Sequence, residues 1–217
     1  MTRRSSGRGV ARPWAGTALL IALAAPALRA QDAHATLPAS LRQGTRMAVM
    51  ALADSLTREG LPGGGLYAKA AEGVLKGADD ARVLEAVRSV ASRLREARRA
   101  LGPHASAADL EAGASALFAG VSPGTLARFS SPSRPASRTQ TLANTLTVLA
   151  DLVWKGVPVE RVTQSIEALT ARGAYDRHLT ALRAAFDQEL NAGRDPIASL
   201  NRGTAQVLRA LDRPSSP

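Results

Sequence analysis

Apolar residues recur at intervals of three and four along much of this chain, and this spacing restricts the fold more than any other feature. Similar patterns cover residues 83–101, 142–153, 159–169, 179–190 and 197–211. Such spacing is typical of one face of an α-helix, and no segment alternates convincingly as a half-buried strand would. The pattern therefore predicts an all-α protein. The first series consists of Val83, Val87, Val90, Leu94, Ala97 and Leu101.

Glycine and proline mark where the helices are expected to end and begin. Glycine adopts the left-handed conformation after a helix at low cost, and proline is tolerated in the first turn of the next helix. Ser122, Asp195 and the pair Asp79-Asp80 are expected as N-caps. Short corners of this kind predict an antiparallel helical bundle or helical repeat of about eight helices. Glycine is followed by proline within three residues at Gly60, Gly120, Gly156 and Gly193.

Two segments resemble each other when the sequence is shifted by 79 residues. Residues 71–87 read AEGVLKGADDARVLEAV, and residues 150–166 read ADLVWKGVPVERVTQSI. In both segments, four residues separate a Lys-Gly pair from an Arg-Val pair. This similarity predicts a fold built from two related helical halves.

The predicted organisation follows from these segments and from the composition around them. We expect helical half 1 at 37–129 and helical half 2 at 136–212. Residues 130–135, which are rich in serine and proline, are the predicted linker. Residues 31–36 and 213–217 are expected to be disordered tails.

The shared Lys-Gly-x4-Arg-Val signature resembles uncharacterised exported bacterial proteins with repeated E-G-x-x-K-G-V-P-x-E-R-V-like helical segments. The window 155–162 fits best, whereas the first window has Ala78-Asp79-Asp80 in place of Val-Pro-x. The resemblance covers only the two windows quoted above. It implies an exported helical protein and supplies no catalytic residues.

A structural role explains the repeated charged residues better than a chemical one. In each window an acid precedes a lysine by four residues, a spacing that stabilises a helix by about 0.2–0.5 kcal/mol. The following glycine would end the helix, and the arginine would reach back over the corner from the next helix. These positions are Glu72, Lys76, Gly77 and Arg82 in the first window, and Asp151, Lys155, Gly156 and Arg161 in the second.

The first thirty residues have the order of a secretory signal peptide. An arginine-rich start precedes an apolar run at 14–28, and Ala30 provides a small residue before polar Gln31-Asp32. The run is shorter than the roughly 20 residues that span a membrane. Cleavage after Ala30 is therefore favoured; cleavage after Ala27 and retention as an anchor are the alternatives. A cleaved chain would be periplasmic or secreted and would keep no stable transmembrane span.

Charge and cysteine content limit the partners and the chemistry. The net charge is +10, but five of the 28 basic residues and none of the 18 acidic ones lie in the predicted signal, so the processed chain would carry +5. Such mild basicity does not require a nucleic-acid partner. The chain has no cysteine, which excludes thiol catalysis, thiolate zinc sites and a lipoprotein-type acylated N-terminus.

The arginine-rich helix face at residues 82–99 is the candidate binding surface. Arg88, Arg95 and Arg99 follow one another at steps of seven and four, so they share a side of the helix. This side could bind an anionic polymer or lipid headgroups, or it could be a solvated face. The helix lacks the aromatic residues that stack on bases in nucleic-acid sites, so no nucleic acid is expected.

Other residue types give no pattern that indicates a catalytic, cofactor or metal site. His34, His104 and His178 lack the spacing of metal ligands, and Gly63-Gly64-Gly65 is a corner without the Gly-Lys-Ser/Thr of a phosphate loop. No Gly-x-Ser-x-Gly elbow is present. Three aromatic residues could anchor a partner or fill gaps between helices, and the second interpretation is favoured. They are Tyr67, Trp154 and Tyr175.

The sequence therefore favours an exported, non-catalytic helical protein that acts as an interaction or structural module in the cell envelope. No enzyme activity and no cofactor are expected, and the partner would be an unknown envelope protein. The alternative is a protein that binds an anionic envelope component or polymer through the 82–99 arginine face.

Overall fold

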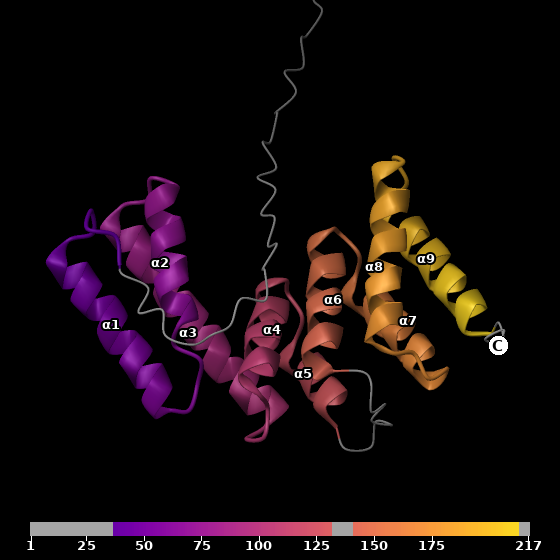
Figure 1. Cartoon of the computed structure of the whole chain (residues 1–217), viewed down its shortest axis with the longest axis horizontal. Helices are drawn as coiled ribbons and strands as arrows, with labels where there is room; N and C mark the ends of the chain where they lie inside the picture. The colour runs from indigo at the N-terminus through magenta and orange to yellow at the C-terminus, as the bar shows by residue number, and fades with distance from the viewer. Residues whose placement is uncertain (1–36, 132–140, 213–217) are drawn as a thin grey trace, which may run out of the picture. The chain divides into compact units, whose positions relative to one another are not determined.

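The computed structural model describes residues 37–131 and 141–212, and the regular secondary structure in these ranges is entirely helical (Figure 1). The predicted all-α class is confirmed. The described residues form nine helices, where the sequence predicted about eight. Their bounds are α1 Gln43–Arg58, α2 Gly65–Leu75, α3 Asp80–Leu101, α4 Ala107–Phe118, α5 Pro123–Ser130, α6 Leu142–Trp154, α7 Val159–Ala171, α8 Asp176–Asn191 and α9 Pro196–Leu211.

Several predicted segments lie outside the described residues. These include the signal peptide, both tails and the linker from residue 132 onward. The linker was predicted to begin at residue 130, but Ser130 is the last residue of α5.

Glycine ends most of these helices, as the corner pattern predicted. At the α6–α7 corner Gly156 has φ 90°. Its N–H donates to the carbonyl of Val153 at 3.0 Å, and the N–H of Val157 donates to the carbonyl of Leu152 at 3.1 Å. These two bonds satisfy carbonyls that the end of a helix leaves without partners. Glycines with positive φ also follow other helices, at Gly60, Gly77, Gly102, Gly120, Gly173 and Gly193.

The predicted N-caps are present at the starts of three helices. The hydroxyl of Ser122 accepts the N–H of Thr125 at 3.1 Å. The carboxylate of Asp195 accepts the N–H of Ala198 at 2.8 Å, and that of Asp79 accepts the N–H of Arg82 at 2.8 Å. Each cap pairs an N–H that the first turn cannot pair within the helix.

The helices bury their apolar faces in one core made largely of leucine, valine and alanine. In α3 the predicted series is buried apart from Val90, which packs against the core from a partly buried position. Gly113 of α4 lies so close to α3 that a Cβ there would be 2.9 Å from Cδ1 of Leu101. Helix α4 also packs beside α6, so the core is continuous between elements on either side of residues 132–140 (Figure 1).

The same kind of contact fixes the starts of two helices. The carboxylate of Asp80, the first residue of α3, accepts the backbone N–H of Arg42 before α1 at 3.0 Å. The carboxylate of Asp176, the first residue of α8, accepts the backbone N–H of Thr141 before α6 at 2.9 Å. In both cases the first residue of a helix is an aspartate that binds the residue at the start of another helix. That other helix precedes it by two helices in chain order.

Candidate functional site

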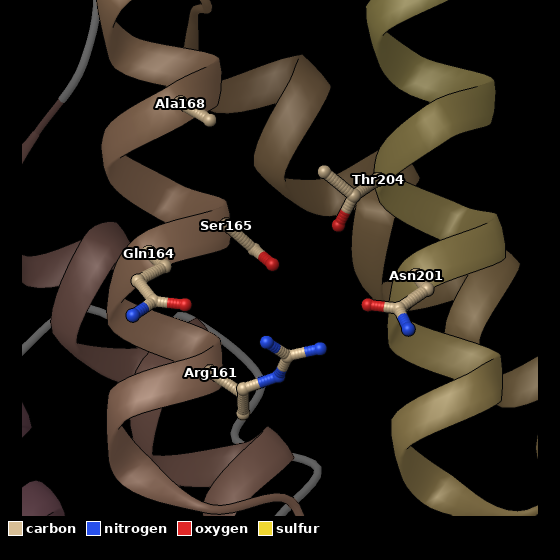
Figure 2. A pocket seen from close by; sticks show the side chains of 6 residues that line it. All are labelled: Arg161, Gln164, Ser165, Ala168, Asn201 and Thr204. Carbon is tan, nitrogen blue, oxygen red and sulfur yellow. The ribbon is translucent and has the colours of Figure 1, made fainter.

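A polar pocket between α7 and α9, with a volume of about 170 Å³, is the candidate functional site (Figure 2). Four lining residues occupy positions i, i+3, i+4 and i+7 of α7, and two occupy positions i and i+3 of α9, so each helix presents one face. The lining residues are Arg161, Gln164, Ser165, Ala168, Asn201 and Thr204.

The apolar residues of the two helices orient these faces. Val162 and Ile166 are fully buried on the other side of α7. Leu200 is fully buried in α9, and a Cβ added at Gly203 would lie 3.3 Å from Cδ1 of Leu182 in α8. Burial of these positions leaves the polar positions between them facing the pocket.

Arg161 contributes the positive charge of the pocket. Its side chain is exposed and forms no ion pair with another described residue. In Figure 2 the guanidinium and the amide of Asn201 extend toward each other from the two helices. The sequence predicted that Arg161 reaches back over the α6–α7 corner; in the structure it lines the pocket instead. The lining residues include no aspartate or glutamate.

The pocket also contains hydrogen-bonding groups that lack protein partners. The hydroxyl oxygen of Thr204 is shielded from solvent and has no hydrogen-bond partner among the described residues. A buried polar group without a partner costs about 1–3 kcal/mol. Figure 2 shows this hydroxyl and that of Ser165 on facing sides of the pocket. The pocket therefore combines one cation with amide and hydroxyl groups.

Both acid–lysine pairs predicted from the repeated windows are present. Glu72 forms ion pairs with Lys76 and also with Lys69, the latter at 2.9 Å. These bonds hold the pKa of the Glu72 carboxyl below its ordinary value, because both ammonium groups donate to the charged form. Nζ of Lys155 lies 2.8 Å from Oδ2 of Asp151.

In the second window this pair belongs to a larger network that the sequence did not indicate. Nζ of Lys155 also lies 2.6 Å from Oδ1 of Asp187 in α8, and Nε of Arg183 lies 2.8 Å from Oδ2 of Asp151. The four partly buried groups tie the end of α6 to α8. The spacing of four residues between Arg183 and Asp187 indicates that they share one side of a helix. It could not show which other helix this side contacts.

Arg82, which occupies the position of Arg161 in the first window, does not reach back over the α2–α3 corner. It is largely exposed, and its Nε lies 4.0 Å from the carboxylate of Asp79, which caps the same helix. The two arginines at equivalent positions of the similar windows therefore have different surroundings.

The predicted arginine face of α3 contains one arginine that is bonded to another helix and two that are unpaired among the described residues. Nε and Nη2 of Arg95 donate to the two carboxylate oxygens of Glu59 at 2.7 and 2.6 Å. These bonds hold the pKa of Glu59 at about 2. Arg88 and Arg99 are exposed and form no ion pair within the described ranges. Only two of the three predicted arginines are thus available to a ligand.

Large apolar side chains are exposed at two equivalent positions of the repeated windows. Leu75 is 87% exposed at the end of α2, and Trp154 is 64% exposed at the end of α6. The expectation that the aromatic residues fill gaps between helices is therefore wrong for Trp154, whereas Tyr67 packs against the core. Tyr175 is 39% exposed, with the guanidinium of Arg177 5.0 Å from its ring centre.

The histidines show no metal-binding arrangement where the structure describes them. Nδ1 of His178 accepts the backbone N–H of Tyr175 at 2.8 Å, which makes it part of the helix cap. Burial, with a smaller contribution from the charge of Arg177, lowers the pKa of His178. His34 lies outside the described residues. Residues 37–131 and 141–212 contain no group of three or more potential metal ligands, and no helix there has the length and hydrophobicity to span a membrane.

The glycine run at the α1–α2 corner has a packing role. A Cβ added at Gly63 would lie 2.6 Å from the carbonyl oxygen of Ala53 in α1, so only glycine fits there without movement of the backbone.

Comparison of the chain with protein-family models, with curated proteins and with solved structures gives no match.

Proposed function

We propose that this chain is an exported, non-catalytic helical protein that binds another protein of the cell envelope through Leu75 and Trp154. The observation that supports this proposal best is the exposure of both side chains immediately before the repeated Lys-Gly corners. An exposed tryptophan is a frequent anchor of protein interfaces, because its large surface is removed from water on binding.

The surroundings of these side chains favour a binding role. Lys76 and Lys155 directly follow them and are held by the ion pairs of the repeated windows. Each exposed apolar group therefore has a charged neighbour whose position is restrained by the fold. A partner could bury the apolar group and meet a charge at its rim, the usual arrangement of an interface.

The proposal includes two related helical halves, each of which presents one such corner. The sequence similarity at a shift of 79 residues supports this relation.

Export is proposed from the N-terminal signal pattern and from the resemblance to exported bacterial proteins. Expression of the full-length chain with a C-terminal tag in a Gram-negative bacterium tests it directly. We expect the tagged protein in the periplasm or medium, with a mass that corresponds to cleavage after Ala30. Unprocessed protein in the cytoplasm would contradict export.

Binding is tested by affinity capture from envelope extracts at high salt, which suppresses purely electrostatic association. We expect one protein to be retained by the wild type and lost with Trp154→Ser combined with Leu75→Ser. Met47→Ser provides a matched control, because Met47 is 59% exposed on α1 and lies outside both windows. Retention that is equal for all three proteins would contradict the proposed surface.

The second candidate function is binding of an anionic envelope component or polymer by α3. The exposed and unpaired state of Arg88 and Arg99 supports it. The two residues are eleven positions apart, which places them on the same side of the helix, roughly 16 Å from each other along its axis. Such binding would be lost at moderate salt, unlike an interface built on apolar side chains.

A further inference from the structure

We propose that the pocket between α7 and α9 binds a carboxylate group, with Arg161 as its cationic partner. This site is separate from the apolar helix ends and from the arginines of α3. The proposal rests on the charge, the hydrogen-bonding groups and the size of the pocket.

The charge of the pocket suits a monoanion. Arg161 is the one charged residue among the six that line it, and it forms no ion pair with another described residue. A guanidinium can donate two parallel hydrogen bonds to a carboxylate, which makes it well suited to this group. A phosphate dianion would leave one negative charge without a partner.

The neutral lining residues provide donors around the guanidinium. The amides of Gln164 and Asn201 can each donate two hydrogen bonds, and the hydroxyl of Ser165 can donate one. The hydroxyl of Thr204 has no partner among the described residues but is shielded from solvent, so the ligand would contact the other lining residues. Arg161 also lies in the first turn of α7, where the helix dipole favours negative charge.

The size of the pocket limits the part of a ligand that it can hold to a small group. Its volume of about 170 Å³ is below the roughly 300–1,000 Å³ of sites that enclose drug-sized molecules. The carboxylate could come from a free short-chain acid or from the end of a peptide. Both sources have the same chemistry at the guanidinium, and an experiment can separate them.

The experiment is a titration of the ¹⁵N-labelled protein, followed by amide chemical shifts at low ionic strength. The probes are sodium propionate, a short acetylated peptide with a free C-terminal carboxylate, the same peptide with an amidated C-terminus, and inorganic phosphate. We expect saturable shifts in α7 and α9 with a carboxylate probe and none with the amidated peptide. Binding of propionate alone would identify a free acid as the source, whereas binding of the carboxylate peptide alone would identify a peptide terminus.

Variants at Arg161 test its role. Arg161→Gln keeps hydrogen-bond donors but removes the charge, and we expect it to weaken binding about tenfold or more. Arg88→Gln is the matched control, because it removes an exposed, unpaired arginine from a different helix; we expect the affinity to change by no more than about twofold. Both residues lack ion-pair partners within the described ranges, so thermal unfolding should be nearly unchanged in both variants.

Three results would overturn the proposal. They are the absence of saturable shifts with either carboxylate probe, equal or tighter binding of phosphate, and an Arg161→Gln variant that binds as tightly as the wild type.

Discussion

Glu59 and Arg95 join the end of α1 to α3 by two hydrogen bonds of 2.7 and 2.6 Å. The hydroxyl of Ser55 donates to the same carboxylate at 2.9 Å. One turn further along α3, Nη2 of Arg98 donates to the carbonyl of Gly60 at 2.8 Å. Two arginines of α3 therefore hold the C-terminal end of α1, where unpaired carbonyls favour positive charge.

This arrangement predicts how acid affects stability. The bonds from Arg95 and Ser55 lower the pKa of Glu59 from 4.5 to about 2, so the unfolded chain binds a proton there more readily than the folded protein does. The stabilisation is fully present above pH 4.5 and is lost as the pH falls toward 2. We expect Glu59→Gln to remove this part of the pH dependence, as measured by urea unfolding at a series of pH values.

Glu85→Gln is the control for this measurement. Glu85 is an exposed residue of α3 without an ion pair to another described residue. Its replacement should leave the difference in unfolding free energy between pH 6 and pH 3 near that of the wild type. If Glu59→Gln and Glu85→Gln changed this difference equally, the Glu59–Arg95 bonds would not be its source.

The network around Lys155 predicts a second effect on stability. Lys155 lies between Asp151 and Asp187, so Lys155→Ala leaves these carboxylates without their shared ammonium group. We expect the unfolding free energy to fall by about 1 kcal/mol, because the groups are only partly buried and water screens the remaining charges. Chemical denaturation measures the loss, and a cycle with Asp187→Asn measures the coupling between the two residues.

Arg172→Ala provides the comparison. Its ion pair with Asp212 has a similar length of 2.8 Å, but both side chains are about 60% exposed. We expect a smaller loss there, because exposed pairs contribute about 0–1 kcal/mol. A loss at Arg172 as large as that at Lys155 would contradict the view that partial burial strengthens the network.

The helices and their corners could be predicted because local sequence determines them. Apolar spacing depends on the period of the helix, and glycine at a helix end depends on the conformation of one residue. The N-caps at Ser122 and Asp195 are likewise decided within four residues of the chain. In all these cases the interacting groups are neighbours in sequence.

The partners of the charged residues could not be predicted, because they depend on which helices pack together and in what register. Arg95 and Glu59 are 36 residues apart, and Lys155 and Asp187 are 32 apart. The sequence placed Arg95 on an exposed face of the helix that either binds an anion or is solvated, whereas α1 supplies a carboxylate to it. The pocket was missed for the same reason, since Arg161 and Asn201 meet only when α7 packs against α9.

Gly156 offers a test of the corner geometry. Its φ of 90° lies in a region that residues with a Cβ rarely adopt, while the nearest atom to an added Cβ is Cγ of Pro196 at an ordinary 3.7 Å. The cost of Gly156→Ala is therefore conformational, and we expect about 1–2 kcal/mol of unfolding free energy to be lost. Urea unfolding of the variant measures this loss.

Gly64→Ala is the matched control for the corner. Gly64 has helical backbone angles, and nothing lies within 4 Å of an added Cβ. We expect unchanged or slightly higher stability, because alanine reduces the freedom of the unfolded chain. Equal destabilisation by the two substitutions would contradict a conformational origin of the effect at Gly156.

The arginines of α3 give a final prediction, which separates binding from packing. If this helix binds an anionic polymer, Arg88→Glu combined with Arg99→Glu should abolish retention on heparin at low salt, because both side chains are exposed and unpaired. Arg95→Gln should instead lower the unfolding free energy and leave retention largely intact, since the guanidinium of Arg95 is bonded to Glu59. Elution salt concentration and urea unfolding measure the two properties separately. Retention that survives the double substitution would exclude this face as the polymer-binding surface.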